Sequence, residues 1–137
     1  MNTLTKQEVF NKVWNRFVVL KKPLSFVRVK PSNVICCLMR GAGGAMDPIG
    51  MFVPNENYQP WMDEAGGCTV KTFLTELKNQ ALLEQDWTNI FVTHQKLFEE
   101  LQEIHDDVAV FVKPRRRLGA IAGRLRKLAN KHKLVVP

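Results

Sequence analysis

Four side chains have the chemistry of an active site: the Cys37 thiol, the Arg40 guanidinium, the His105 imidazole and the Asp106 carboxylate. His105 could act as a general base oriented by Asp106, and Cys37 could act as a nucleophile beside a histidine. Their spacing matches no catalytic template. A buried small cysteine and a helix-end histidine bonded to its neighbouring carboxylate account for the same residues. We therefore assign no catalytic residue, and an enzyme using His105 and Asp106 stays a second alternative.

The glycine-rich segment 41–44 could cradle a phosphate or form a turn. A Walker loop needs Lys-Ser/Thr after its glycines and a helix beyond them, whereas Asp47-Pro48 follows here. A dinucleotide-binding loop must also open a helix. Because the apolar run Ile49–Val53 is typical of a strand, we predict that the glycines supply positive φ angles for a hairpin turn.

Neither the cysteines nor the histidines have the spacing of a metal site. The three cysteines, at 36, 37 and 68, form no Cys-x-x-Cys pair and leave an odd thiol. Neighbouring Cys36 and Cys37 in a strand would point to opposite faces. The sequence predicts no metal and no cofactor, and it leaves the roles of Cys36, Cys37 and Cys68 open.

Positive charge is concentrated near the C-terminus. Nine of the 20 Lys and Arg residues lie in the segment 108–137, which contains no Asp or Glu. The remaining eleven cations face all 13 anions, so the rest of the chain is slightly acidic although the whole has a net charge of +7. This asymmetry predicts an anionic partner for the C-terminal segment.

A basic C-terminal helix, predicted over about 114–133, arranges this charge. Its apolar residues fall on one face, and we place the cations nearly opposite, facing water. The ridge could bind nucleic-acid phosphates without sequence specificity. It could instead be a solvated face, or dock on an acidic protein surface such as another copy of the chain. The predicted contact residues are Arg115, Arg116, Arg117, Arg124, Lys127 and Lys131.

The 137 residues predict a single α+β domain with about four helices packed on a small antiparallel β-hairpin near 34–53. The expected helices start at Thr5, with Glu8 completing a capping box, at Thr69, at Thr88 or Thr93, and at Pro114. The expected strands are 34–39 and 49–53, with a further short strand at 26–29. A break is expected at Gly66-Gly67, and an extended piece at 108–112.

No apolar run is long enough to span a bilayer, and the first residues lack a signal core. The chain is therefore expected to be cytoplasmic, with no membrane partner, in an oligomeric state that stays open. A loop could add contacts through Arg40, Tyr58 and Trp61. Those side chains could equally be tied to the protein's own body by ion pairs and packing.

Several motifs in order resemble a family of small uncharacterised proteins of bacteria and phages. The family pattern is Cys-Leu-x-Arg-Gly, Ile-Gly, Ile/Val-Pro, Tyr-x-Pro-x-Met and Leu-Gln-x-Ile-His-Asp. Asp47-Pro48 stands where the family usually has Cys-Ala, so no second cysteine supports Cys37 there. The resemblance implies a compact cytoplasmic α+β domain in a mobile-element setting, without a known activity. The matching residues are Cys37, Leu38, Arg40, Gly41, Ile49, Gly50, Val53, Pro54, Tyr58, Pro60, Met62, Leu101, Gln102, Ile104, His105 and Asp106.

These observations leave two main functions. The first is a non-enzymatic accessory protein that binds nucleic acid non-specifically through the basic C-terminal helix. The alternative is a protein-binding regulator or inhibitor of phage or mobile-element origin.

Overall fold

The first helix begins where the capping residues predict. Thr5 Oγ1 accepts the Glu8 N–H at 3.1 Å, and the Glu8 carboxylate accepts the Thr5 N–H at 3.0 Å. This reciprocal pair satisfies two N–H groups that the start of a helix leaves free. Helix α1 spans Lys6–Trp14 and continues as a π-helical stretch, Asn15–Val19. Its buried face consists of Val9, Phe10, Val13 and Trp14.

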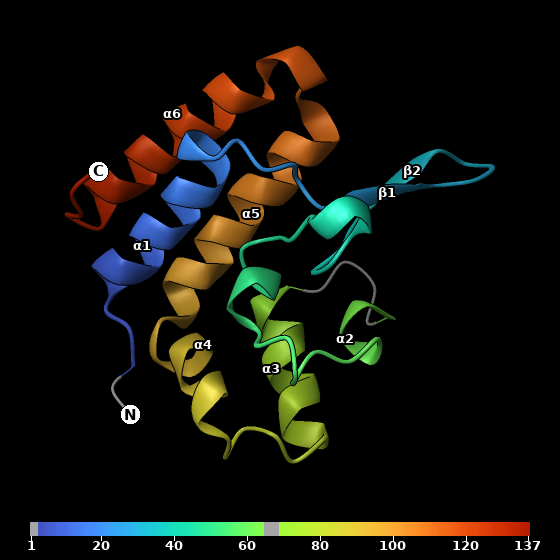
Figure 1. The fold of residues 1–137 in the computed structure, drawn as a ribbon, viewed down its shortest axis with the longest axis vertical. Helices are drawn as coiled ribbons and strands as arrows, with labels where there is room; N and C mark the ends of the chain where they lie inside the picture. The colour runs from blue at the N-terminus through green and yellow to red at the C-terminus, as the bar shows by residue number, and fades with distance from the viewer. Residues whose placement is uncertain (1–2, 65–68) are drawn as a thin grey trace.

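The structure, a computed structural model, describes residues 3–64 and 69–137. The predicted break at Gly66-Gly67 and the third cysteine, Cys68, lie outside these ranges. Within them the chain is α+β, with six α-helices rather than about four and one two-stranded antiparallel sheet (Figure 1). The other helices are α2 (Trp61–Glu64), α3 (Val70–Asn79), α4 (Asn89–Thr93), α5 (Gln95–Phe111) and α6 (Arg117–Lys131).

Two helix boundaries in the second half differ from the prediction. The long helix expected from Thr88 or Thr93 is split at His94 into α4 and α5. Helix α5 then continues through Asp106-Asp107 to Phe111, where an extended piece was expected. The acidic pair does not end the helix because Asp106 accepts a hydrogen bond from His105, and because buried Val108 and Ala109 hold its last turns on the core.

The hairpin pairs different segments from those predicted. Strand β1, Phe26–Val29, runs antiparallel to β2, Val34–Cys37, with Val29 opposite Val34 and Phe26 opposite Cys37. The apolar run after the glycines is instead a 3-10 turn, Gly50–Phe52. It turns because Asp47 Oδ1 accepts the Gly50 N–H at 2.6 Å, as an N-terminal cap does.

The glycine segment is a tight turn, as predicted, but it does not join two strands. Gly43 and Gly44 have φ angles of 67° and 77°, which other residues adopt at a cost. The loop is closed by the Gly41 N–H, which donates to the Ala45 carbonyl at 2.8 Å. Arg16 donates to the Gly44 carbonyl at 3.0 Å, so this loop is fixed to α1's extension.

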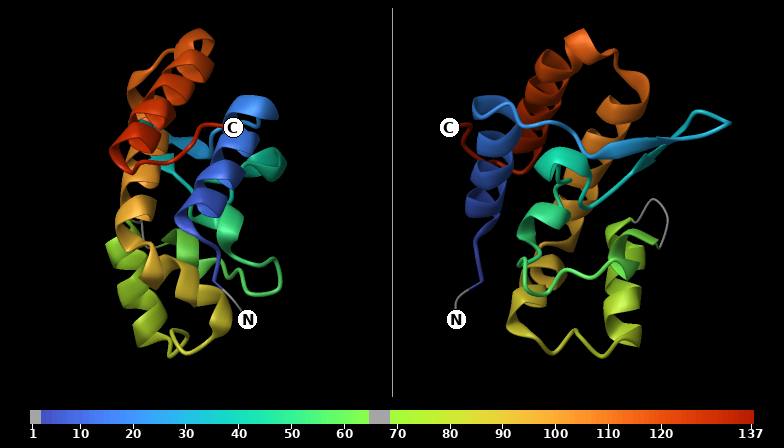
Figure 2. Two further views of the ribbon diagram at one scale, coloured as in Figure 1. Left: turned by 90° about the vertical axis from the view of Figure 1, so that its left-hand side faces the viewer. Right: turned by 45° about the vertical axis from the view of Figure 1, so that its right-hand side comes forward.

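Helix α5 is the centre of the arrangement. Helices α1 and α6 lie along one side of it, α3 and α4 lie toward its N-terminal end, and the hairpin projects from the body near its C-terminal end (Figures 1 and 2). A chain of aromatic rings fills the centre, in which Phe91 lies 4.9 Å from Phe98 and 5.4 Å from Phe73 between ring centroids. None of the described helices is both long and apolar enough to cross a membrane.

Candidate functional site

Three of the four side chains considered for chemistry meet at one point. Cys37 at the end of β2 lies beside His105 and Asp106 of α5, with the potential ligand atoms all within 4.8 Å of one another. His105 is fully buried, and the Ser25 N–H donates to its Nε2 at 3.0 Å. Its Nδ1 donates to Asp106 Oδ1 at 2.9 Å. The site therefore joins α5 to both strands of the hairpin region.

The hydrogen bonds of His105 fix its chemistry. A backbone N–H can only donate, so Nε2 must offer its lone pair to Ser25 and the ring proton must sit on Nδ1. A metal at Nδ1 would require a neutral ring to carry its proton on Nε2, where it would face the Ser25 N–H. A general base would likewise need a free lone pair. Both ring nitrogens are committed to structural bonds, which disfavours a metal site and a catalytic role here.

Cys37 is held as a thiol by the same cluster. Burial raises the pKa of the Cys37 thiol well above its usual range, and the charge of Asp106, to which the thiol donates a hydrogen bond, raises it further. A protonated thiol is a poor nucleophile and a poor metal ligand. The enzyme hypothesis required Arg40 to join this cluster, and its guanidinium is engaged elsewhere.

Arg40 instead organises the loop that follows the glycine turn. Its guanidinium donates to Asn55 Oδ1 at 2.7 Å and to the Val53 carbonyl, and it lies 4.8 Å from the centre of the Tyr58 ring. Tyr58 donates its hydroxyl proton to Asp63, while Trp61 packs against the core. The three predicted loop contacts are thus partly buried and tied to the protein's own body.

A buried carboxylate that the sequence did not single out adjoins the cluster. Asp47 is 2% exposed, and its Oδ2 accepts from Gln102 Nε2 at 2.7 Å. The same Gln102 nitrogen donates to Asp106 at 3.1 Å, which links Asp47 to the His105 cluster. Burial raises the pKa of Asp47 to about 6, although the nearby His105 and then the hydrogen bonds from Gly50 and Gln102 oppose the shift.

This pKa predicts a pH-dependent stability. Because the folded-state pKa exceeds the ordinary value of 3.8, the folded protein holds the Asp47 proton more tightly than the unfolded chain. The resulting stabilisation is complete below about pH 4 and is lost as the pH rises through about 6. The difference between the folded-state pKa and the ordinary value corresponds to about 3 kcal/mol in the free energy of unfolding.

The test compares urea denaturation of the wild type and Asp47→Asn between these pH values. The variant lacks the titrating group, so its free energy of unfolding should rise relative to the wild type as the pH increases, by about 3 kcal/mol in total. Asp86→Asn, which replaces an exposed carboxylate, controls for the loss of one charge. Parallel pH profiles for the wild type and Asp47→Asn would contradict the assignment.

Three of the six predicted contact residues in the C-terminal segment are turned toward α5. Arg117 donates to the Val112 and Ala109 carbonyls at 3.0 and 3.2 Å, Lys131 pairs with Glu100 at 2.8 Å, and Arg124 approaches Asp107 at 3.9 Å. The expectation that Arg117, Arg124 and Lys131 lie nearly opposite the apolar face of the helix is wrong. Residues seven apart form a row whose centre is only about a quarter turn from the apolar stripe.

We call the other three, Arg115, Arg116 and Lys127, the outer cations. Arg115 and Arg116 lie in the 3-10 turn Pro114–Arg116 that precedes α6, which therefore starts later than the predicted residue 114. Lys127 lies on α6 at the edge of a groove that also contains Glu103 and Asp107 of α5. All three are exposed, and no carboxylate among the described residues forms an ion pair with them. Gly119 and Gly123 also lie on α6, and a Cβ added at either would meet no atom within 4 Å. The outer cations therefore border an open helix surface.

Comparison of the chain with protein-family models, with curated proteins and with solved structures finds no match. The resemblance to small phage and bacterial proteins stays a prediction. Any function has to be argued from the geometry.

The sequence did not reveal a second group of cations, which lies near Arg117 at the start of α6. Arg28 in β1 lies near enough to Arg117 for its charge to lower the pKa of that guanidinium, after the larger effect of burial. Lys21 and Lys22, which precede β1, are exposed and line the same pocket as Arg117 of α6. The alternating pattern Phe26-Val-Arg-Val29 signals a strand with one outward cation, but it does not say that this strand lies beside the basic helix.

Proposed function

We propose that the protein is a cytoplasmic, non-enzymatic accessory protein that binds nucleic acid non-specifically through phosphate contacts of the outer cations. The observation that carries the proposal is the exposure of Arg115, Arg116 and Lys127 without a carboxylate partner among the described residues. Cations that the protein does not neutralise itself can pair with nucleic-acid phosphates, and each such contact gains free energy by releasing cations that were condensed on the nucleic acid.

The flank toward α5 supports this surface in a secondary way. Arg124 and its partner Asp107 are both about half exposed and 3.9 Å apart, a geometry that contributes little to stability. A phosphate can therefore replace Asp107 at small cost. Lys131 forms the closer pair, at 2.8 Å from Glu100, so it is less available to a phosphate than Arg124. Arg117 is oriented by two neutral carbonyls, which do not compensate its charge.

The competing functions receive less support. The regulator or inhibitor of phage or mobile-element origin stays a prediction, because no contact between described residues favours a protein partner. The enzyme hypothesis is disfavoured by the bonds at both nitrogens of His105.

A gel-shift titration tests the proposal directly. Purified protein should shift duplex DNA, single-stranded DNA and single-stranded RNA at about 50 mM salt, with dissociation constants in or below the micromolar range. Binding to all three is expected because phosphates, not base edges, are contacted. Failure to shift any of them at this salt concentration would contradict the proposed function.

A further inference from the structure

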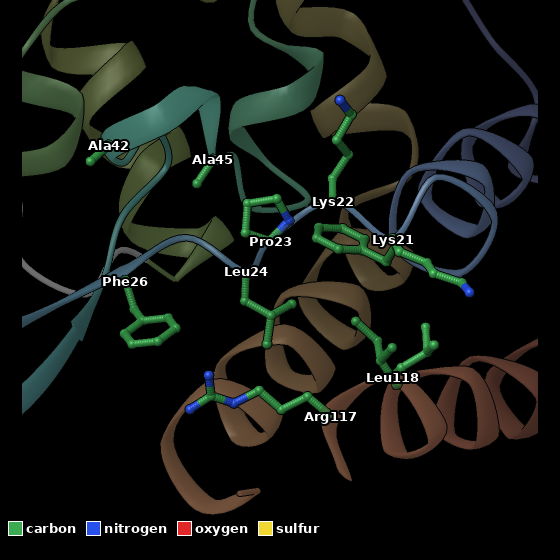
Figure 3. A pocket seen from close by; sticks show the side chains of 11 residues that line it. Lys21, Lys22, Pro23, Leu24, Phe26, Ala42, Ala45, Arg117 and Leu118 are labelled. Carbon is green, nitrogen blue, oxygen red and sulfur yellow. The ribbon is translucent and has the colours of Figure 1, made fainter. Parts of the chain in front are cut away.

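A hollow of about 390 Å³ lies between the start of α6, the glycine turn and the segment that leads into β1 (Figure 3). Its walls are mainly apolar, and no Asp or Glu is among the described residues that line it. This volume falls in the range of small-ligand sites, roughly 300 to 1,000 Å³. The lining residues are Phe17, Lys21, Lys22, Pro23, Leu24, Phe26, Ala42, Ala45, Arg117, Leu118 and Ile121.

Arg117 fixes a positive charge at one end of this hollow. Figure 3 shows its side chain passing beneath Leu24 toward Phe26, and the guanidinium lies 4.9 Å from the centre of the Phe26 ring. Its bonds go to backbone carbonyls at the end of α5, which orient it without supplying a full negative charge.

Arg28 is a second cation close to Arg117, and the two positive charges together favour a bound anion. Burial, and after it the charge of Arg28, lower the pKa of Arg117, so a nearby anion would stabilise its guanidinium charge. Lys21 and Lys22 extend outward from the rim in Figure 3, so they add positive potential without filling the hollow. A phosphate near Arg117 would relieve the repulsion between the two guanidinium groups.

The apolar part of the site suits a flat ring. Phe26 and Leu118 offer apolar surface beside Arg117, and Leu118 is 41% exposed although it is a large hydrophobic side chain. Phe111, at the end of α5 next to the Val112 carbonyl that Arg117 binds, is 80% exposed. Exposed aromatic rings beside cations are the usual means of stacking unpaired bases.

We propose that this hollow receives an unpaired base of a single-stranded nucleic acid, with the adjacent phosphate at Arg117 and a neighbouring base on Phe111. The inference rests on the proposed function and adds to it a preference for single strands over duplexes. A base in a duplex is paired and stacked, so it cannot enter the hollow, and a duplex makes only the phosphate contacts.

Fluorescence anisotropy with a labelled oligothymidylate of about 12 nucleotides and a duplex of equal length tests the inference at about 50 mM salt. The single strand should bind at least about fivefold more tightly than the duplex. Leu118→Trp, which fills the hollow, should weaken single-strand binding about fivefold and leave duplex binding within about twofold. Val92→Trp places the same ring on an apolar residue of α4 that is 53% exposed and does not line the hollow, and it should change neither affinity.

Two results overturn the inference while the proposed function stands: equal affinity for single strand and duplex, or a Leu118→Trp variant that keeps the single-strand preference. If neither oligonucleotide binds, the proposed function fails and the inference fails with it. Thermal unfolding of the variant checks its fold. If Leu118→Trp does not fold, Leu118→Gln makes the same test, because it removes the apolar wall at a position already 41% exposed.

Discussion

Replacing the outer cations with glutamine, as Arg115→Gln, Arg116→Gln and Lys127→Gln together, should weaken binding to duplex DNA about a hundredfold at low salt. Each lost phosphate contact removes counterion release, so the salt dependence should also become shallower by nearly three in the slope of log K against log salt. The fold should be unaffected, because exposed side chains without ion-pair partners change stability by less than about 0.5 kcal/mol. Anisotropy titrations over a range of salt concentrations measure both effects.

The matched control removes the same charge elsewhere. Lys71, Lys78 and Lys96 are exposed on α3 and at the start of α5, in the half of the molecule away from α6 (Figure 1). Their triple glutamine variant has the same net charge as the outer-cation variant. It should lose only a few-fold in affinity, the share due to the overall field. Equal losses in the two variants would show that binding depends on the net charge of the protein and not on the outer cations.

Gly50→Ala should destabilise the fold by about 3 kcal/mol or more, the largest stability effect we expect. An added Cβ would lie 2.0 Å from the Met39 carbonyl oxygen and 2.7 Å from its carbon. That backbone cannot move aside freely. The Met39 N–H donates to Asp63 at 2.6 Å, and the Met39 carbonyl accepts the Asp47 N–H at 3.2 Å. Movement of residue 50 would also break the Asp47 cap described above.

Gly123→Ala makes the same substitution at a position where we expect the opposite effect on stability. A Cβ there meets open space in the middle of a helix, so the variant should be more stable by up to about 1 kcal/mol. Chemical denaturation of the two variants beside the wild type measures both signs. If Gly50→Ala were as stable as the wild type, the close contact with Met39 would be wrong.

Local signals in the sequence were sufficient for two of the four predicted helix starts, whereas Thr88 makes no side-chain cap and α6 starts at Arg117 instead of Pro114. Thr5 and Thr69 both cap helices at the predicted positions, since capping depends on residues three apart. The partner of Val34–Cys37 was not predictable from such signals. The run after the glycines has the composition of a strand, and only the buried Asp47 cap and the approach of Gly50 to Met39 turn it into a 3-10 helix.

The candidate sites divide in the same way. His105 and Asp106 are neighbours, so their pairing could be foreseen, whereas Asp47 and Gln102 are 55 positions apart and nothing local connects them. The number of cations near the C-terminus could be read from the sequence, but the prediction misplaced the face of α6 on which three of them lie. Rotation of about 100° per residue places Arg117, Arg124 and Lys131 beside the apolar stripe, where α5 supplies Glu100 and Asp107.

The salt dependence of wild-type binding tests the central claim most directly. If exposed phosphates are held by the outer cations and their neighbours, log K for duplex DNA should fall linearly with log salt, with a slope of about −3 or steeper. Affinity should then drop by well over tenfold between about 50 and 200 mM salt. An affinity that changes less than about twofold over that range would mean that binding does not use the outer cations, and it would contradict the proposed function.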